Sequence, residues 1–149
     1  MLRFTKRSDY GLMAIHYIAS HHAIGPISAK RIAETFHIPY ELLAKILQRL
    51  ARKGLITSWN GPKGGYFLTK APEQITVGEV VRALEGPVQI VSCMESLGCV
   101  QYPYCNWRGP VQKIQASVID LLNTMTLADL MRGPRPPVAQ LSPREAILS

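Results

Sequence analysis

Three cysteines stand at equal steps in the stretch "CMESLGCVQYPYC", and they are all the cysteines of this 149-residue chain. Cys93, Cys99 and Cys105 follow a C-x5-C-x5-C spacing. Six residues turn a helix by about 600°, so on a helix successive cysteines would face different directions. Gly98 and Pro103 also favour a loop, which can wrap around one centre and direct three thiolates toward it.

Thiolates suit zinc, copper(I) and iron–sulfur clusters. A structural zinc site usually has four ligands and a closer C-x2–4-C spacing, so an iron–sulfur cluster (2Fe-2S or 4Fe-4S) is the better match. The plain alternative is three loop thiols without a ligand role. An odd cysteine count argues against a closed disulfide framework, and no membrane or export segment is evident. We therefore expect a cytoplasmic chain with reduced thiols.

A cluster held by three cysteines needs at least one more ligand, and this ligand must come from elsewhere in the chain or from another subunit. The histidines all lie far from the cysteine loop in sequence: His16, His21, His22 and His37. Asp9, near the start of the first expected helix, is a candidate oxygen ligand that would make the cluster more labile. The alternative is that Asp9 is a first-turn acid favoured by the helix dipole, which is the commoner case.

The elements around these residues begin with a helix-turn-helix pattern. We expect a first helix up to about Ser20, a second over residues 29–36 with Ser28 as its N-cap, and a third over residues 39–53 ended by Gly54. The third helix has an inner apolar stripe and a basic outer face. That outer face carries Lys45, Arg49, Arg52 and Lys53.

A Gly-rich connection, residues 60–65, lies between two strand-forming runs, residues 55–59 and 66–69. A phosphate-binding loop of the P-loop type would need a Gly-Lys-Ser/Thr end that opens a helix. Here Lys63 is followed by two glycines and a strand, so the segment is interpreted as the tip of a wing. A wing can lay lysine and backbone N–H groups against DNA phosphates or into a minor groove, although a plain structural hairpin would look similar.

The charge is divided unevenly along the chain. Residues 1–70 carry eleven Lys or Arg and three acids, a net of 11 − 3 = +8, whereas residues 71–149 carry six and seven, a net of −1. A basic half joined to a neutral half suggests a polyanion-binding module attached to a part with another task. A solvated basic surface without a partner is the alternative.

The second half begins with a capping box at Thr76 and Glu79, which opens a helix that Gly86 and Pro87 end. A long helix is expected over residues 111–131, with a wide apolar face that a second copy of the chain would cover. The resulting division is a winged DNA-binding domain (1–72), a linking helix and cysteine loop (73–110), a dimerisation helix (111–132) and a disordered tail (133–149). The fold class is mainly α with a small β-hairpin wing.

In their order, these features resemble the Rrf2 family of bacterial winged-helix regulators. The resemblance rests on "LRFTKRSDYGLMAIHYIA", "HIPYELLAKILQRLARKGLI", "GPKGGYFL", "ITVGEVVRALEG", the cysteine spacing and "LADL", and it covers about residues 1–131. It implies a homodimer with crossing long helices and Cys93, Cys99 and Cys105 as cluster ligands. IscR-like members use a histidine three residues after the third cysteine, where this chain has Arg108.

NsrR-like members use an aspartate in a Thr-Asp-Tyr stretch, which matches Ser8-Asp9-Tyr10 and points to Asp9 donated across the dimer. The glutamate with which IscR-like proteins discriminate between DNA sites is replaced by Ala44.

The function expected is therefore a cluster-dependent repressor, not an enzyme, acting on a pseudo-palindromic operator and controlling cluster-assembly genes. Nitric-oxide or redox-stress sensing is the alternative within the family. An electron-transfer protein, or a DNA-binding sensor that uses thiol oxidation or zinc, is the alternative of another class. The expected DNA contacts are Ser28, Tyr40, Glu41, Lys45, Arg49, Arg52, Trp59, Lys63 and Gly64.

Overall fold

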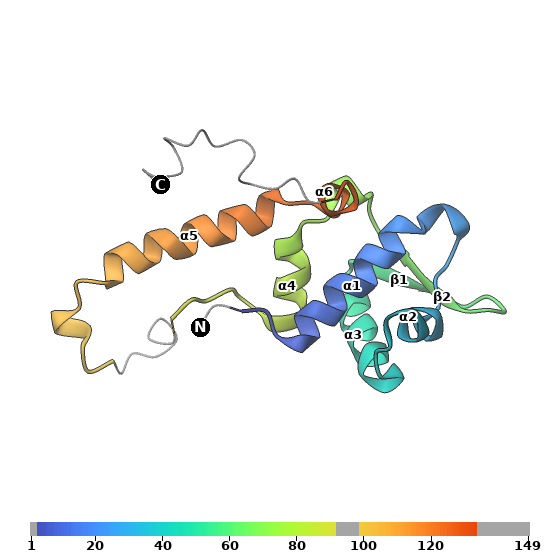
Figure 1. The fold of residues 1–149 in the computed structure, drawn as a ribbon, viewed down its shortest axis with the longest axis horizontal. Helices are drawn as coiled ribbons and strands as arrows, with labels where there is room; N and C mark the ends of the chain where they lie inside the picture. Colours follow the sequence, from blue (N-terminus) through green and yellow to red (C-terminus); the bar gives the residue numbers. More distant parts are fainter. Residues whose placement is uncertain (1–2, 92–98, 134–149) are drawn as a thin grey trace.

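The computed structural model describes residues 3–91 and 99–133, which are mostly helical and include one two-stranded antiparallel hairpin. This confirms the predicted fold class. Figure 1 shows a winged body, made of the elements up to α4 together with α6, and an arm, residues 99–124, that extends away from it. The elements are α1 (Lys6–Ser20), η1 (His22–Ile24), α2 (Ala29–Phe36), α3 (Tyr40–Arg52), β1 (Ile56–Trp59), β2 (Gly65–Leu68), η2 (Pro72–Gln74), α4 (Val77–Glu85), η4 (Tyr102–Tyr104), α5 (Arg108–Thr124) and α6 (Leu127–Met131).

Local signals explain the helix-turn-helix unit. Thr5 caps α1 by accepting the Ser8 N–H, and Ser28 caps α2 by accepting the Arg31 N–H at 3.1 Å. The turn between α2 and α3 passes through His37, whose φ of 54° is left-handed. Gly54, with a φ of 78°, follows the end of α3. The three predicted helices are confirmed to within a few residues.

The wing is the hairpin of β1 and β2, paired from Ile56 opposite Leu68 to Trp59 opposite Gly65. Gly65 has a φ of 141°, and a Cβ at this position would lie 3.0 Å from the backbone of Ile27. The approach is this close because Ile27 and Tyr66 exchange two backbone hydrogen bonds of 2.9 and 3.1 Å. Both the conformation and the contact therefore require glycine at the start of β2, next to the loop of the wing.

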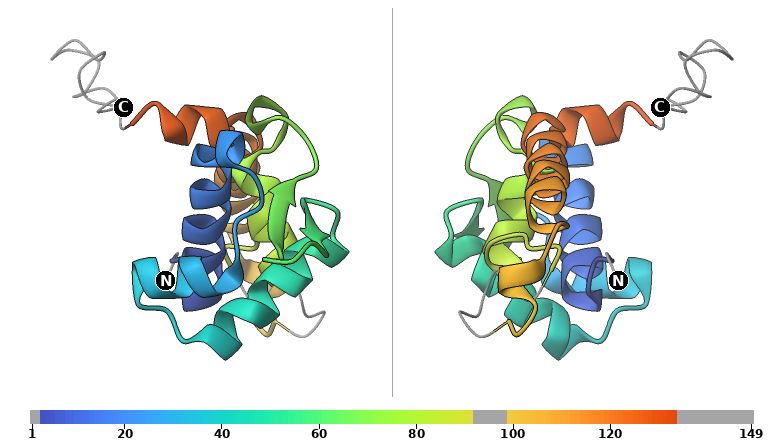
Figure 2. Two further views of the ribbon diagram at one scale, coloured as in Figure 1. Left: turned by 90° about the vertical axis from the view of Figure 1, so that its right-hand side faces the viewer. Right: turned by 90° about the vertical axis from the view of Figure 1, so that its left-hand side faces the viewer.

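The core of the body joins α1, α3, α4 and β1, and α6 completes it. Its fully buried side chains include Ile15, Leu47, Leu84 and Leu127. α3 and α6 lie on opposite sides of the body, as Figures 1 and 2 show. The surface of α3 that would meet DNA is thus well separated from the junction between the body and the arm.

The prediction of one continuous helix over residues 111–131 was wrong. α5 begins earlier, at Arg108, and ends at Thr124, after which Met125 is extended and Thr126 caps the separate helix α6 with Asp129. Residues far away in the sequence stabilise this break. The Met125 carbonyl accepts the Val77 N–H at 2.8 Å, and the Leu127 N–H donates to the Ile75 carbonyl at 2.9 Å. Leu127 is thereby buried in the body instead of on a dimer surface.

The arm contacts the body through the C-terminal part of α5. Gly78 of α4 lies against Leu122 and Asn123, and Arg82 donates to Asn123 Oδ1 at 3.1 Å. No helix in the described ranges is long and apolar enough to cross a membrane. The predicted tail from residue 134 onward and Cys93 lie outside the described residues.

Candidate DNA-binding surface and cluster site

The outer face of α3 carries Glu41, Lys45, Gln48 and Arg52, all exposed and spaced at three or four residues. The opposite face holds the buried residues of the helix. Among the described residues, no hydrogen bond or ion pair engages the side chains of Glu41 or Lys45. Gln48 was not predicted as a DNA contact, although its helical spacing from Lys45 is the signal that could have identified it.

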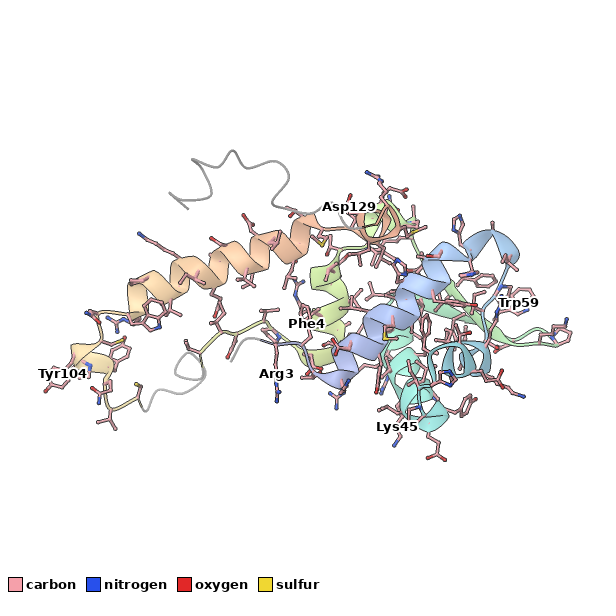
Figure 3. The ribbon with its side chains drawn as sticks, in the orientation of Figure 1. Arg3, Phe4, Lys45, Trp59, Tyr104 and Asp129 are labelled. Atoms are coloured by element: carbon pink, nitrogen blue, oxygen red, sulfur yellow. The ribbon has the colours of Figure 1, made fainter. Side chains whose placement is uncertain are left out.

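Tyr40 is also exposed, at the N-terminal end of α3, and Figure 3 shows Lys45 on the outer side of the body. This arrangement leaves one aromatic ring and several charged or amide groups free at the part of a recognition helix that usually enters the major groove. The predicted contacts of Tyr40, Glu41, Lys45 and Arg52 remain predictions with suitable exposure.

Arg49 has a second task that the sequence did not indicate. Its guanidinium donates from Nε to the carbonyl of Ala83, in the last turn of α4, at 3.0 Å. The side chain is half-buried and ties the recognition helix to α4. A phosphate contact by Arg49 remains a prediction, and only its other guanidinium nitrogens could make it.

The wing presents Trp59, which is half exposed and packs edge-to-face on Phe67 with ring centroids 5.8 Å apart. A Cβ on Gly61 would overlap the indole, so glycine lets the ring pack closely against the tip. Lys63 is exposed at the tip, and Gly64 has a φ of 58°. The wing thus displays one cation and one aromatic ring to the solvent.

Ser28 lies at the start of α2. Its hydroxyl oxygen accepts the Arg31 N–H, which leaves the O–H proton available to a phosphate oxygen. Ser28 is half-buried beside the bridge that joins Ile27 to Tyr66 of β2. Its predicted DNA contact is compatible with its role as a cap.

Cys99 and Cys105 are free thiols, both half-buried, on either side of η4 at the start of the arm. The Arg108 guanidinium lies 4.1 Å from the centroid of the Tyr102 ring, so it makes a cation–π contact. The described residues contain no group of three or more His, Cys, Asp or Glu that could hold a metal ion.

Asp9 lies in the first turn of α1 and is half-buried. In Figure 3, Tyr104 of the cysteine loop stands at the far end of α5 from Arg3 and Phe4, which precede α1. One chain therefore does not bring Asp9 beside Cys99 and Cys105. A site shared by these three residues requires a second chain.

Residues 4–133 match the model of the Rrf2 family, which is described as an iron-dependent transcriptional regulator. This protein belongs to the Rrf2 family. A protein named NsrR from Shouchella clausii is 32% identical over 132 residues, which cover 87% of this chain and 89% of the relative. A protein named IscR from Erwinia tasmaniensis is also 32% identical over 132 residues, which cover 89% of this chain and 80% of the relative.

Protein rrf2 of Nitratidesulfovibrio vulgaris is 38% identical over 146 residues, covering 97% of this chain and 94% of the relative. Among solved structures, CymR, the global cysteine regulator of B. subtilis, is 31% identical with a TM-score of 0.72 over 90% of this chain and 99% of that one. IscR of T. potens is 28% identical with a TM-score of 0.72 over 95% of this chain and 93% of that chain.

The Rrf2 relatives are regulators of transcription, so this Rrf2 protein is a DNA-binding regulator and not an enzyme, as expected. Its described thiols fit the soft donor set that an iron–sulfur cluster takes. Cys99 and Cys105 are not joined in a disulfide, flank one turn and keep part of their surface open.

Proposed function

We propose that this Rrf2 protein is a dimeric, cytoplasmic repressor whose operator affinity is set by an iron–sulfur cluster. The observation that carries the proposal is the placement of two free thiols on one turn at the far end of α5 from their own winged body. A ligand loop in this position can reach the body of a second chain. The spacing of the cysteines and the relatives named IscR and NsrR support the same assignment.

Cys93, Cys99 and Cys105 of one chain and Asp9 of the other would hold the cluster. When bound, the cluster supplies a centre whose loss or damage by nitric oxide or oxygen can be sensed. Asp9 belongs to α1, which packs directly on α3 in the body. A carboxylate bound across the dimer therefore fixes the separation of the two recognition helices, and release of that carboxylate changes their fit to two half-sites.

DNA binding is assigned to the exposed side of the body. Tyr40, Glu41 and Lys45 would face the major groove of a pseudo-palindromic operator, and Arg52 would meet phosphates. The wing would place Trp59, Lys63 and Gly64 against the backbone or the minor groove. The first candidate regulon is a set of cluster-assembly genes, and the second is a set of nitric-oxide or redox-stress response genes.

The structural relatives named CymR favour one further candidate, because one is described as a cysteine regulator and another as an oxidised form. A regulator of the CymR kind would sense thiol oxidation without a cluster. An electron-transfer protein is disfavoured, since it would have no use for the exposed cationic face of α3.

Purification without oxygen separates these candidates. We expect brown protein with iron and acid-labile sulfide in stoichiometric amounts, and a colourless Cys99→Ser variant that still folds. Colourless parent protein, with or without zinc, would exclude the cluster. Asp9→Ala should keep part of the cluster spectrum but lose it faster in air, whereas the control Asp120→Ala, on the exposed side of α5, should behave like the parent.

The recognition helix can be tested by the salt dependence of operator binding. Arg52→Ala should weaken binding to all sequences and reduce the slope of log K against log salt by about one unit. Lys45→Ala should mainly relax discrimination at one base pair. The control Lys113→Ala removes an exposed cation from α5 and should leave both quantities unchanged. Unchanged binding in both α3 variants would mean that α3 does not read DNA.

A further inference from the structure

A cavity of about 400 Å³ lies between the start of the chain, the end of α4 and α5. Its walls are mainly apolar and include Phe4, Val81, Val118 and Leu122. Arg3 and Glu85, both with exposed side chains, also line it. An apolar cavity with a cation and a carboxylate at hand suits an aromatic side chain that carries a polar tip, such as tyrosine.

The cysteine loop displays side chains of this kind. Tyr104 is 84% exposed, and no hydrogen bond or ring contact engages its side chain among the residues that the structure describes. Val100, Tyr102 and Trp107 are also more than half exposed, so four large side chains within eight residues face the solvent. Such a cluster of exposed aromatic residues is typical of a protein–protein interface.

The loop cannot fill the cavity of its own chain. It stands at the N-terminal end of α5, whereas Val118 and Leu122 belong to the C-terminal half of this helix, and Figure 3 shows Tyr104 far from Phe4. A 17-residue helix is about 25 Å long. In a two-fold dimer with antiparallel α5 helices, each loop would instead reach the cavity of the other chain.

We propose that Tyr104 of each protomer inserts into the cavity of its partner and anchors the cysteine loop there. This proposal rests on the proposed dimer and adds the contact that completes its shared site. Tyr104 directly precedes Cys105, and Ser8, in the cavity wall, directly precedes Asp9. Insertion of the tyrosine therefore brings a thiol of one chain next to the carboxylate of the other.

The apolar surface of α5 continues this contact. Ile114 and Leu121 are exposed along the helix, and Met125 is exposed directly after its end. Pairing of two such helices would bury this surface and hold each loop opposite a cavity. Glu85 Oε1 already accepts from the Thr5 and Ser8 hydroxyls, so the phenol O–H could then donate to Glu85 Oε2, or the phenol oxygen could accept from Arg3.

Photo-cross-linking of the full chain tests the insertion directly. Benzoylphenylalanine placed at Tyr104 should give a covalent dimer on irradiation, and mass spectrometry should map the linkage to residues 3–8, 81–89 or 118–122. The same probe at Ile24, an exposed residue of η1 in the body, should give no linkage to these segments. Absence of a covalent dimer, or linkage of Tyr104 to other segments, would overturn the proposal.

A second measurement uses side-chain truncation. Tyr104→Ala should raise the dimer dissociation constant about tenfold or more, as for an anchoring aromatic residue, and Tyr104→Phe should raise it less. Equal dissociation constants for parent and Tyr104→Ala would contradict an anchor. Both measurements are independent of iron and sulfide content. A protein without a cluster would therefore refute the proposed function, whereas the cross-linking and dissociation results would still decide whether Tyr104 inserts into the partner.

Discussion

The winged body and the arm differ in how much of their apolar side-chain surface is buried within one chain. In the body, residues from α1, α3, α4, β1 and α6 reach zero to one per cent exposure, and the described residues contain no buried side-chain nitrogen or oxygen without a hydrogen-bond partner. In the arm, α5 buries only Val111, while Ile114, Leu121 and the aromatic residues of the cysteine loop face the solvent. The body is complete as one chain, and the arm has a surface that remains to be covered.

This contrast separates two kinds of stability. Substitutions in the body should change the free energy of unfolding of each chain. Substitutions on the arm should change association and leave the folded chain intact. The junction between the two, where α4 meets the end of α5, should show both effects.

The largest effect is expected for Leu127→Ala, which removes a fully buried side chain of α6 from the core of the body. We expect a loss of about 2–5 kcal/mol in the free energy of unfolding, from lost burial and the cavity left behind. Urea denaturation followed by circular dichroism would measure it.

The matched control is Leu121→Ala, six residues earlier on the arm, where the side chain is 58% exposed. It should change the unfolding free energy of dilute protein by no more than about 0.5 kcal/mol and increase dimer dissociation. Similar losses of stability in the two variants, at a concentration where the parent is monomeric, would abolish the distinction between body and arm.

An intermediate effect is expected at the junction. A Cβ at Gly78 would overlap the Asn123 side chain and lie 3.2 Å from the backbone of Leu122. Gly78→Ala should therefore cost about 1–3 kcal/mol through overpacking, partly offset by about 1 kcal/mol of helix propensity. Amide hydrogen exchange in α5 should become faster than in the parent.

Gly109→Ala is the control for this change, because a Cβ there meets no atom within 4 Å. It should be neutral or slightly stabilising. If Gly78→Ala proves equally harmless, the arm is not held against α4 as tightly as the contact indicates.

The smallest effect concerns the pH dependence of the body. Burial alone would raise the pKa of Glu79, but the Thr76 N–H hydrogen bond and the Lys70 ammonium outweigh it, so the pKa lies below its ordinary value of 4.5. A carboxyl with a lowered folded pKa stabilises the fold above about pH 4.5, and this contribution disappears as the pH falls through the folded pKa.

Glu79→Gln should therefore reduce stability at pH 7 and lose most of its difference from the parent in strongly acidic buffer, which urea titrations at several pH values would show. Asp120→Asn, on the exposed side of α5, is the control and should show no such convergence. A Glu79→Gln difference that stays constant from pH 7 to pH 3 would mean that the Glu79 carboxylate does not carry this pH dependence.

The sequence by itself determined the winged helix-turn-helix, because its signals act over a few residues. Ser28, Gly54 and the glycines of the wing specify caps and turns locally, and the apolar spacing of α3 indicates which face is outside. The exposure of Lys45 and Arg52 followed from the same periodicity. The C-x5-C-x5-C spacing likewise marked the cysteine loop without any structural information.

Only the tertiary structure decided the features that depend on distant contacts. The helix predicted to run to Met131 is interrupted because the backbone around Met125 pairs with the start of α4, about fifty residues earlier. Arg49 is tied to Ala83 for the same kind of reason. The separation of Asp9 from the cysteine loop also depends on where α5 points, and periodicity along a helix carries no information about its direction in space.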